Sequence, residues 1–135
     1  MAVKLDMSKA YDHVEWSFLE AIVRRLRFAE GWISVIMCCV TSVNYSMLAN
    51  GVPYCKIKSS RGLRQGDPLS PYLFLLVDEG LSSMLVRAEM GRQITGVPFS
   101  VGGIWLSHLF FANDSLIFCR ANFTEWVNLM DILKL

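Results

Sequence analysis

The clearest structural signal in this sequence is the segment Leu106–Cys119, LSHLFFANDSLIFC. Two apolar runs rich in β-forming residues, Leu106–Phe111 and Leu116–Cys119, flank the short polar interruption Ala112–Ser115. This pattern is typical of a β-hairpin, because asparagine and aspartate tolerate the backbone angles of tight turns. A carboxylate on such a rigid tip is aimed at one point in space, so Asp114 is a candidate functional residue.

The composition predicts one folded domain with a sizeable core. The chain has 135 residues, 53% hydrophobic and 19% charged, which excludes a disordered protein. This apolar fraction is high for a free-standing soluble domain and suggests surface that a larger protein would cover. The longest nearly apolar run, residues 32–43, is shorter than the ~20 residues that cross a bilayer, so no membrane span is expected.

The cysteines and the N-terminus favour an intracellular location, nuclear or cytoplasmic. The four cysteines show neither zinc-ligand spacing nor a disulfide framework, and Cys38 and Cys39 lie in an apolar helical pattern as small hydrophobic residues. No basic leader with an apolar region and a small-residue cleavage site is present, so no secretion signal is expected. The net charge of +1 neither indicates nor excludes a nucleic-acid partner.

The periodicity of the whole chain predicts an α+β layer, a mostly antiparallel sheet with helices packed on one face. The order is β-α-α-β-β-α-β-β-α. The expected elements are a strand at 2–7, helices at 12–28 and 32–41, strands at 44–49 and 53–59, a helix from 70 to about 91, the two strands of the opening hairpin and a helix from 124.

Local signals set the expected boundaries. Asp12 and Glu15 have the spacing of a capping box at a helix start, and Gly31 is expected to separate this helix from a second, more buried one. Asn50-Gly51 is a strong hairpin turn signal, and Ser70-Pro71 is typical of a helix N-terminus. The core face of that third helix is expected to be Leu73, Val77, Gly80, Met84 and Ala88.

Three aspartates stand out by their positions. Asp6 lies near the end of the first expected strand, Asp67 in the loop before the third helix and Asp114 at the hairpin tip. Each alone is most simply a solvated or capping residue. If the first strand lies beside the hairpin, Asp6 and Asp114 could share a divalent cation, because adjacent strands are about 5 Å apart. Spacing alone leaves that adjacency open.

The loop before the third helix is the second candidate site. Residues 61–71, RGLRQGDPLSP, place two arginines, two glycines and a glutamine just ahead of a helix N-terminus, and two lysines precede them. Glycine permits close backbone approach, arginine suits phosphate and a helix N-terminus favours anions. A solvated loop with proline punctuation is the alternative, at even odds on composition alone.

Three segments, Lys4–Asp12, Arg64–Pro71 and Phe111–Asp114, occur in the order of the palm motifs of reverse transcriptases. The chain therefore resembles that family, and most of all its non-LTR (LINE-type) retrotransposon branch. The resemblance covers nearly the whole chain. It implies a polymerase palm-like antiparallel sheet with helices on one face plus part of the fingers, so that residues 1–135 form a single partial reverse transcriptase domain.

The resemblance implies roles in two-metal phosphoryl transfer with Mg²⁺ or Mn²⁺. Asp6 would be the first metal-binding carboxylate, the Met7 carbonyl would lie near the second ion, and Asp114 would belong to the acidic pair of the hairpin. Tyr11, which by itself is more simply a core aromatic, would be the gate that excludes a 2′-hydroxyl.

The same resemblance implies partners for the loop. Gln65 and Gly66 would border the incoming nucleotide and the template, beside Arg61 and Arg64. An RNA template, a DNA primer and a deoxynucleoside triphosphate are the expected partners, with no membrane.

Asn113 departs from the family pattern, which has aspartate there. Asparagine keeps the shape and one carbonyl oxygen but lacks the negative charge, so two carboxylates instead of three would face two divalent cations. We expect weaker metal binding and at least a ~10²-fold loss of rate, by analogy with removal of one preorganised electrostatic group.

Two alternatives stay open beside this catalytically impaired polymerase. One is a non-catalytic remnant that binds nucleic acid or a protein, and the other is the translated product of a decayed element. The chain starts almost at the first motif and ends soon after the third. We therefore expect the remaining fingers, the thumb and any endonuclease domain to be absent, so that missing segments or another protein would cover the exposed apolar surface.

Overall fold

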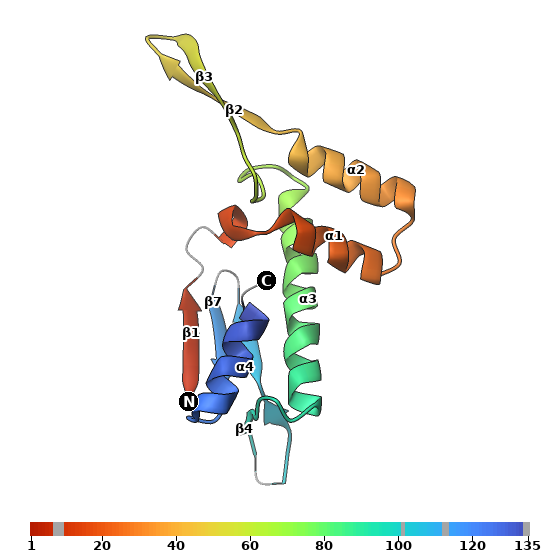
Figure 1. Ribbon diagram of the computed structural model, residues 1–135, viewed down its shortest axis with the longest axis vertical. Helices are drawn as coiled ribbons and strands as arrows, with labels where there is room; N and C mark the ends of the chain where they lie inside the picture. Colours follow the sequence, from red (N-terminus) through yellow and green to blue (C-terminus); the bar gives the residue numbers. More distant parts are fainter. Residues whose placement is uncertain (7–9, 101, 112–113, 134–135) are drawn as a thin grey trace. The chain divides into compact units, whose positions relative to one another are not determined.

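The computed structural model describes residues 1–6, 10–100, 102–111 and 114–133 (Figure 1). Contacts within the chain define two compact units. The sheet unit comprises residues 1–10 and 78–135, and the helix–hairpin unit comprises residues 11–77. The long helix α3, Ser70–Met90, begins in the helix–hairpin unit and ends in the sheet unit.

A three-stranded antiparallel sheet organises the sheet unit. Its strands are β1 (Ala2–Asp6), β7 (Asp114–Phe118) and β6 (His108–Phe111), in the order β1-β7-β6. The predicted hairpin is therefore confirmed as the β6–β7 pair, and the N-terminal strand lies along its β7 edge.

One face of this sheet carries the core, as the sequence predicts. Ile117 of β7 is fully buried, and Val3 and Leu5 of β1 pack against the same cluster as α3 and α4 (Phe123–Leu133). Strand alternation explains this, because every second side chain points to the same face. The buried cluster consists of Leu85, Ala88, Ile94, Ile117, Cys119 and Leu129.

A short strand pair that the sequence did not predict follows α3. β4 (Val97–Pro98) pairs with β5 (Trp105–Leu106), and the connection between them includes Gly102 at φ +74°. Runs of two residues are too short to give a periodic signal, so only a connection was expected here.

A buried carboxylate anchors α4. The Glu125 side chain accepts hydrogen bonds from the backbone N–H groups of Thr95 and Arg120, at 2.8 and 2.9 Å, and from the Thr95 hydroxyl. The Glu125 N–H in turn donates to Asn122 Oδ1, which caps the helix. Burial alone would raise the pKa of Glu125, but these hydrogen bonds outweigh it and lower the pKa.

The helix–hairpin unit starts with a 3₁₀ turn, η1 (Ala10–His13), followed by α1 (Trp16–Arg25). The predicted capping box is wrong: Asp12 lies inside η1, and Glu15 is the N-cap without a side-chain capping bond. The Glu15 carboxylate instead pairs with a cationic side chain distant in sequence, which local spacing does not reveal.

The helix boundary near Gly31 also differs from the prediction. Arg27 adopts φ +60° just after the end of α1, and α2 (Glu30–Thr41) contains Gly31 in its first turn. Helix α2 is less buried than expected, since Trp32 is 65% exposed. The side chains of Cys38 and Cys39 are exposed as well.

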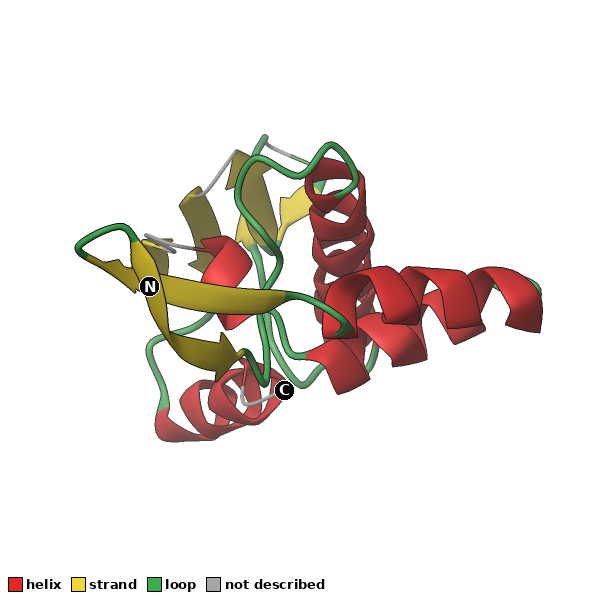
Figure 2. Cartoon of the chain, turned by 90° about the horizontal axis from the view of Figure 1, so that it is seen from above, coloured by secondary structure: helices red, strands yellow, loops and turns green. Residues whose placement is uncertain are grey.

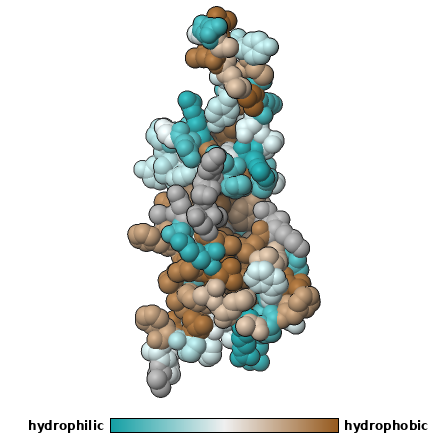
Figure 3. Space-filling model, turned by 90° about the vertical axis from the view of Figure 1, so that its left-hand side faces the viewer, coloured by the Kyte–Doolittle hydropathy of each residue, from teal (hydrophilic) through white to brown (hydrophobic). Residues whose placement is uncertain are grey.

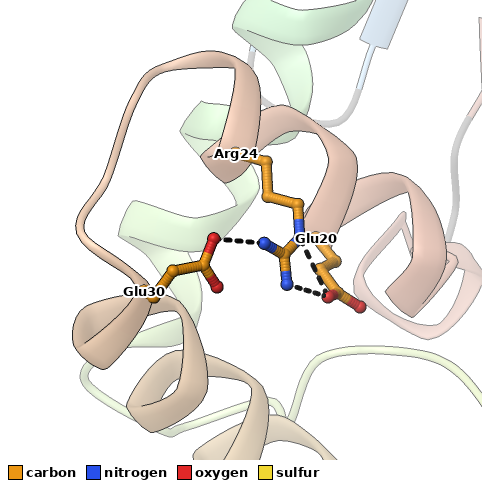
Figure 4. Close-up of polar contacts among 3 residues, drawn as sticks. All are labelled: Glu20, Arg24 and Glu30. Carbon is orange, nitrogen blue, oxygen red and sulfur yellow. Dashed lines mark hydrogen bonds and ion pairs between the residues drawn. The ribbon is translucent and has the colours of Figure 1, made fainter.

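An exposed ion-pair network joins α1 to α2, which lie side by side (Figures 1 and 2). Arg24 donates to Glu20 on its own helix, at 2.9 Å, and to Glu30 at the start of α2 (Figure 4). The predicted Glu20–Arg24 pair is therefore confirmed. The buried residues of the two helices are all apolar: Leu19, Ile22, Val23, Ile33, Ile36 and Val40.

The second hairpin is confirmed as β2 (Asn44–Ala49) and β3 (Val52–Lys58). Asn50 and Gly51 form its turn with φ +53° and +78°, as the sequence predicts. Every residue of both strands is exposed, and the register shifts after Met47. Among the described residues, no helix is long and apolar enough to span a bilayer.

Candidate functional site

The backbone brings the two predicted metal-binding aspartates together. In the β1–β7 register, Asp6 lies directly opposite Asp114, at the end of one strand and the start of the other. Facing residues of an antiparallel pair have Cα atoms about 4.5–5.5 Å apart. The strand adjacency that the sequence left open is thus present in the sheet unit.

Asp114 also has a cationic neighbour on β1. The Lys4 Nζ lies 3.3 Å from Asp114 Oδ1, and both side chains are more than half exposed. Exposed pairs of this kind contribute roughly 0–1 kcal/mol, so Lys4 does not lock the carboxylate. No sequence pattern gave Lys4 a role, because its contact with Asp114 depends on the pairing of β1 with β7.

The face of the sheet opposite the helices is apolar around this charged pair. Ser115 and Ile117 are buried on the helix side, and alternation therefore places Asp114 on the other face. Leu109 and Phe111 of β6 are 49% and 81% exposed. Figure 3 shows hydrophobic atoms with a few hydrophilic groups among them over the lower part of the view, where the sheet unit lies.

The donor chemistry of the two facing residues, Asp6 and Asp114, fits a hard divalent cation. Carboxylates are the charged oxygen ligands that Mg²⁺ and Mn²⁺ prefer, and the backbone sets two aspartates at facing positions. The described residues contain no group of three His, Cys, Asp or Glu side chains placed to hold a metal. Asn113 and Met7, the other predicted members of the site, lie outside the described residues.

In the helix–hairpin unit, backbone hydrogen bonds fasten the segment around Tyr11 to the loop before α3. The Leu63 N–H donates to the Tyr11 carbonyl at 2.7 Å, and the Gly62 N–H donates to the Val14 carbonyl at 2.8 Å. The Trp16 indole N–H donates to the Gly62 carbonyl. These bonds join the end of the first motif segment, at Tyr11, to the candidate loop of residues 61–71 within one unit.

Gly62 is the residue that permits this close approach. A Cβ atom there would lie 3.1 Å from both Cα and O of Asp12, and Gly62 has φ +92°, a conformation that favours glycine. The sequence predicts that glycine in this loop permits close backbone approach. The group that approaches Gly62 is the backbone of Asp12 in the same chain.

Tyr11 is partly buried against Phe74 of α3, with ring centroids 4.9 Å apart and planes tilted by 31°. This contact is that of a core aromatic residue, the simpler of the two interpretations of Tyr11. A contact with a sugar stays a prediction.

The predicted loop residues differ in their surroundings. Arg61 Nη1 lies 3.3 Å from Glu15 Oε1, whereas Arg64, Gln65 and Gly66 are exposed at the turn. No ion pair of Arg64 occurs among the described residues. Within the part of the chain that the structure describes, the loop therefore presents one tethered and one free guanidinium group.

Asp67 has a structural role, which is the simpler of the two interpretations that the sequence allows for it. Its Oδ1 accepts a hydrogen bond from the Leu69 N–H at 2.8 Å, which shapes the turn into α3. Beside it, Arg64, Ser59 and Tyr45 help to line a small pocket of about 20 Å³ within this unit. That volume accommodates little more than a water molecule.

The sheet unit contains two titratable groups that the sequence did not mark as functional. His108 accepts or donates hydrogen bonds at both ring nitrogens, to Ser82 at 2.8 Å and to Ser107 at 3.1 Å, and burial lowers its pKa. Burial raises the pKa of Asp78 on α3 to about 6. An aspartate inside a largely apolar helix is a signal that could have found Asp78, whereas the two serine contacts of His108 depend on tertiary structure.

Comparison with known proteins identifies the family. The family model described as reverse transcriptase (RNA-dependent DNA polymerase) matches residues 1–134. Pol polyproteins of R2 retrotransposable elements are similar over most of this chain: one from Popillia japonica is 33% identical over 117 residues, and one from Drosophila melanogaster is 31% identical over 119 residues. These matches cover 85% and 86% of this chain.

The two R2 polyproteins are much longer than this chain. It spans only 16% and 10% of those two polyproteins. It is also 46% identical over 68 residues, half of its length, to an uncharacterized mitochondrial protein of Arabidopsis thaliana, and spans 56% of that protein. The family match over nearly the whole chain and the R2 relatives lead to one conclusion: the chain belongs to the reverse transcriptase family and to its non-LTR retrotransposon branch.

Proposed function

We propose that this chain is the palm region, with part of the fingers, of an RNA-directed DNA polymerase that uses two-metal nucleotidyl transfer and is catalytically impaired. The observation that carries the proposal is the register of β1 and β7, which sets Asp6 opposite Asp114. Two carboxylates at adjacent strand ends form the minimal donor set for a catalytic divalent cation.

In this proposal Asp6 and Asp114 hold Mg²⁺ or Mn²⁺, with the Met7 carbonyl near the second ion. The bound ions would activate the primer 3′-hydroxyl and stabilise the triphosphate and its leaving group. Lys4, next to Asp114, keeps the carboxylate partly neutralised and competes with a cation for it.

Impairment follows from Asn113, which stands beside Asp114 in the sequence. An amide contributes one neutral oxygen where a carboxylate would contribute a charged one, so the site would hold its cations weakly. Because the missing charge acts on the reacting phosphate, the rate should fall by at least ~10²-fold relative to an aspartate at this position.

The remaining predicted residues would contact the nucleotide and the nucleic acid. Tyr11 would bar a 2′-hydroxyl, while Gln65 and Gly66 would border the incoming deoxynucleotide and the template. Arg64 is available for a phosphate because it is exposed and without an ion pair among the described residues. Arg61 would reach a phosphate only by giving up Glu15.

The exposed loop favours a second candidate, a non-catalytic nucleic-acid-binding protein of the same descent. It differs from the first only in lacking turnover, and both are proposed to act inside the cell. In another version of this second candidate, the exposed apolar surface binds a protein partner instead of nucleic acid.

Primer extension tests the proposal. The unmodified chain, Asn113→Asp and Asp114→Asn are each given an RNA template, a DNA primer and deoxynucleotides, with Mg²⁺ and then with Mn²⁺. We expect extension to be barely detectable for the unmodified chain, at least ~10²-fold faster for Asn113→Asp, and absent for Asp114→Asn.

Two results would contradict the proposal. Robust extension by the unmodified chain would exclude impairment, and extension that persists in Asp114→Asn would exclude the assigned site. If Asn113→Asp extends no primer but all three proteins bind RNA, the non-catalytic candidate replaces the polymerase.

A further inference from the structure

The positive charge of the helix–hairpin unit that no nearby acidic residue in the sequence balances is concentrated in one segment. Residues 31–66 contain no aspartate or glutamate, and their basic residues all fall within the last eleven positions, at Lys56, Lys58, Arg61 and Arg64. The rest of the chain has nine basic residues against twelve acidic ones. A near-neutral protein thus carries a local excess of four positive charges on β3 and the loop that follows it.

In the β2–β3 hairpin, alternation separates the lysines from apolar residues over the four pairs from Asn44–Lys58 to Met47–Cys55. Tyr45 pairs with Ile57 and Met47 with Cys55, which places these four on one face. Ser46 pairs with Lys56 and Asn44 with Lys58 on the other face.

Tyr54 precedes the lysines on β3, at the register shift of the hairpin. Met47 pairs with Cys55 and Leu48 with Pro53, so Tyr54 is the extra residue of a bulge, where alternation assigns no face. Tyr54 lies two residues before Lys56 and is 84% exposed. We call Lys56, Lys58 and the neighbouring Tyr54 the lysine face. In Figure 3 the hairpin, at the top, shows hydrophobic and hydrophilic atoms close together.

The lysine face is free to bind a ligand. Both lysines are exposed, and neither makes an ion pair among the described residues. Alternate residues of a strand are ~6.6 Å apart, so the two ammonium groups form a row along β3. Arg64, also exposed, follows in the loop after the strand.

We propose that the lysine face binds the backbone of a single-stranded polynucleotide, with Tyr54 stacking on one of its bases. A row of cations beside an exposed aromatic ring is the combination that recognises single strands, because phosphates and unpaired bases are then contacted together. A duplex would offer its phosphates but hide its bases from Tyr54.

This inference concerns residues outside the motifs of the candidate polymerase site. It rests on the proposed function only for the kind of polymer, since an RNA template is the single strand that a reverse transcriptase would hold. Binding does not require catalysis, so the two can fail separately.

Fluorescence anisotropy with labelled RNA of about 15 nucleotides, the same sequence as DNA, and a duplex of that length tests the proposal. The proteins are the unmodified chain, Lys56→Ala/Lys58→Ala, Tyr54→Ala and a charge-matched control, Arg25→Ala/Arg87→Ala. Each is measured from low to moderate salt, with circular dichroism to confirm that its fold is kept. The RNA and DNA arms determine which single strand is preferred.

We expect both single strands to bind more tightly than the duplex. The double lysine variant should lose about 10-fold or more in affinity at low salt, and the slope of log K against log salt should shrink by about 1.4, or ~0.7 for each lost phosphate contact. Tyr54→Ala should weaken binding about 5-fold or more with little change in slope. The arginine control should bind as the unmodified chain does.

The proposal is overturned if no single strand binds at low salt, if the lysine variant keeps the affinity and slope of the unmodified chain, or if the arginine control loses as much. Tighter binding of the duplex would also overturn it. Asp114→Asn should bind single strands normally even though it extends no primer, which separates this inference from the catalytic proposal.

Discussion

The two long hairpins of this chain are built from similar residues, but one packs against helices and the other is exposed to solvent. The β6–β7 hairpin lies in a sheet whose one face is covered by α3 and α4, and Ile117 at its centre is completely buried. In the β2–β3 hairpin every strand residue is exposed, although alternation separates apolar from polar side chains here too, over the pairs from Asn44–Lys58 to Met47–Cys55. Alternation therefore defines the two faces of a hairpin, while other parts of the protein determine whether a face becomes core.

The largest expected difference between the hairpins is in stability. Ile117→Ala should lower the free energy of unfolding by about 2–5 kcal/mol, because a fully buried side chain leaves a cavity. Met47→Ala on β2, where the side chain is 61% exposed, should change it by less than about 0.5 kcal/mol. Urea unfolding of both variants measures the contrast, and equal losses would show that β2–β3 is covered in solution.

Glu125 provides the next effect and a pH dependence. Its pKa is lower in the folded chain than in the unfolded one, so the folded state binds the proton less readily. The stabilisation is therefore complete above the ordinary glutamate pKa and is lost as the pH falls through the lower, folded value.

Glu125→Gln should accordingly unfold at a lower temperature than the unmodified chain at neutral pH, at a cost of about 1.5–3 kcal/mol for charged hydrogen bonds. The two melting temperatures should converge as the solution becomes acidic. A constant difference from neutral to strongly acidic pH would show that the charge of Glu125 is unimportant.

The loop after the β2–β3 hairpin allows a matched test of backbone strain. Gly62 and Gly66 both have positive φ, but a Cβ atom added at Gly62 would meet backbone atoms 3.1 Å away, while one at Gly66 would face open space. Gly62→Ala should cost about 1–3 kcal/mol, and Gly66→Ala less, since it has strain without a clash. Chemical denaturation measures the free energy of unfolding of both variants. Equal losses would mean that the positive φ alone, and not the close contact at Gly62, determines the cost.

The elements that the sequence predicts best are those with strong local signals. Asn50-Gly51 specified one hairpin turn, and the apolar runs around Asp114 specified the other. The capping box at Asp12 failed because the Glu15 side chain pairs with Arg61, 46 residues away. A local motif competes with tertiary contacts that spacing does not contain.

The candidate site was predicted unevenly for the same reason. The type and spacing of Asp6 and Asp114 indicated a shared cation, but only the register of β1 on β7 places them opposite one another. Lys4 and the contacts of His108 arise from strand and helix packing, so no sequence signal marked them. The predicted core face of α3 was correct at the buried residues Leu73, Gly80 and Ala88, and Val77 and Met84 are half-buried. It omitted two further buried residues, Phe74 and Leu85.

The smallest expected effect concerns Lys4. Lys4→Met removes the ammonium group that competes for Asp114, and Mn²⁺ affinity should rise by no more than about 5-fold, because an exposed ion pair is worth at most ~1 kcal/mol. Calorimetric titration of Mn²⁺ measures the change. Arg92→Met, which removes an exposed charge elsewhere in the sheet unit, should leave the Mn²⁺ affinity unchanged. If Arg92→Met raises the affinity as much as Lys4→Met does, the effect is due to net charge and not to the contact with Asp114.

The most direct test of the central claim is Mn²⁺ titration of the unmodified chain, Asp6→Asn, Asp114→Asn and Asn113→Asp. If Asp6 and Asp114 form a cation site across β1 and β7, both asparagine variants lose Mn²⁺ binding and Asn113→Asp binds it more tightly than the unmodified chain. Equal Mn²⁺ affinity in the unmodified chain and Asp114→Asn would contradict the account.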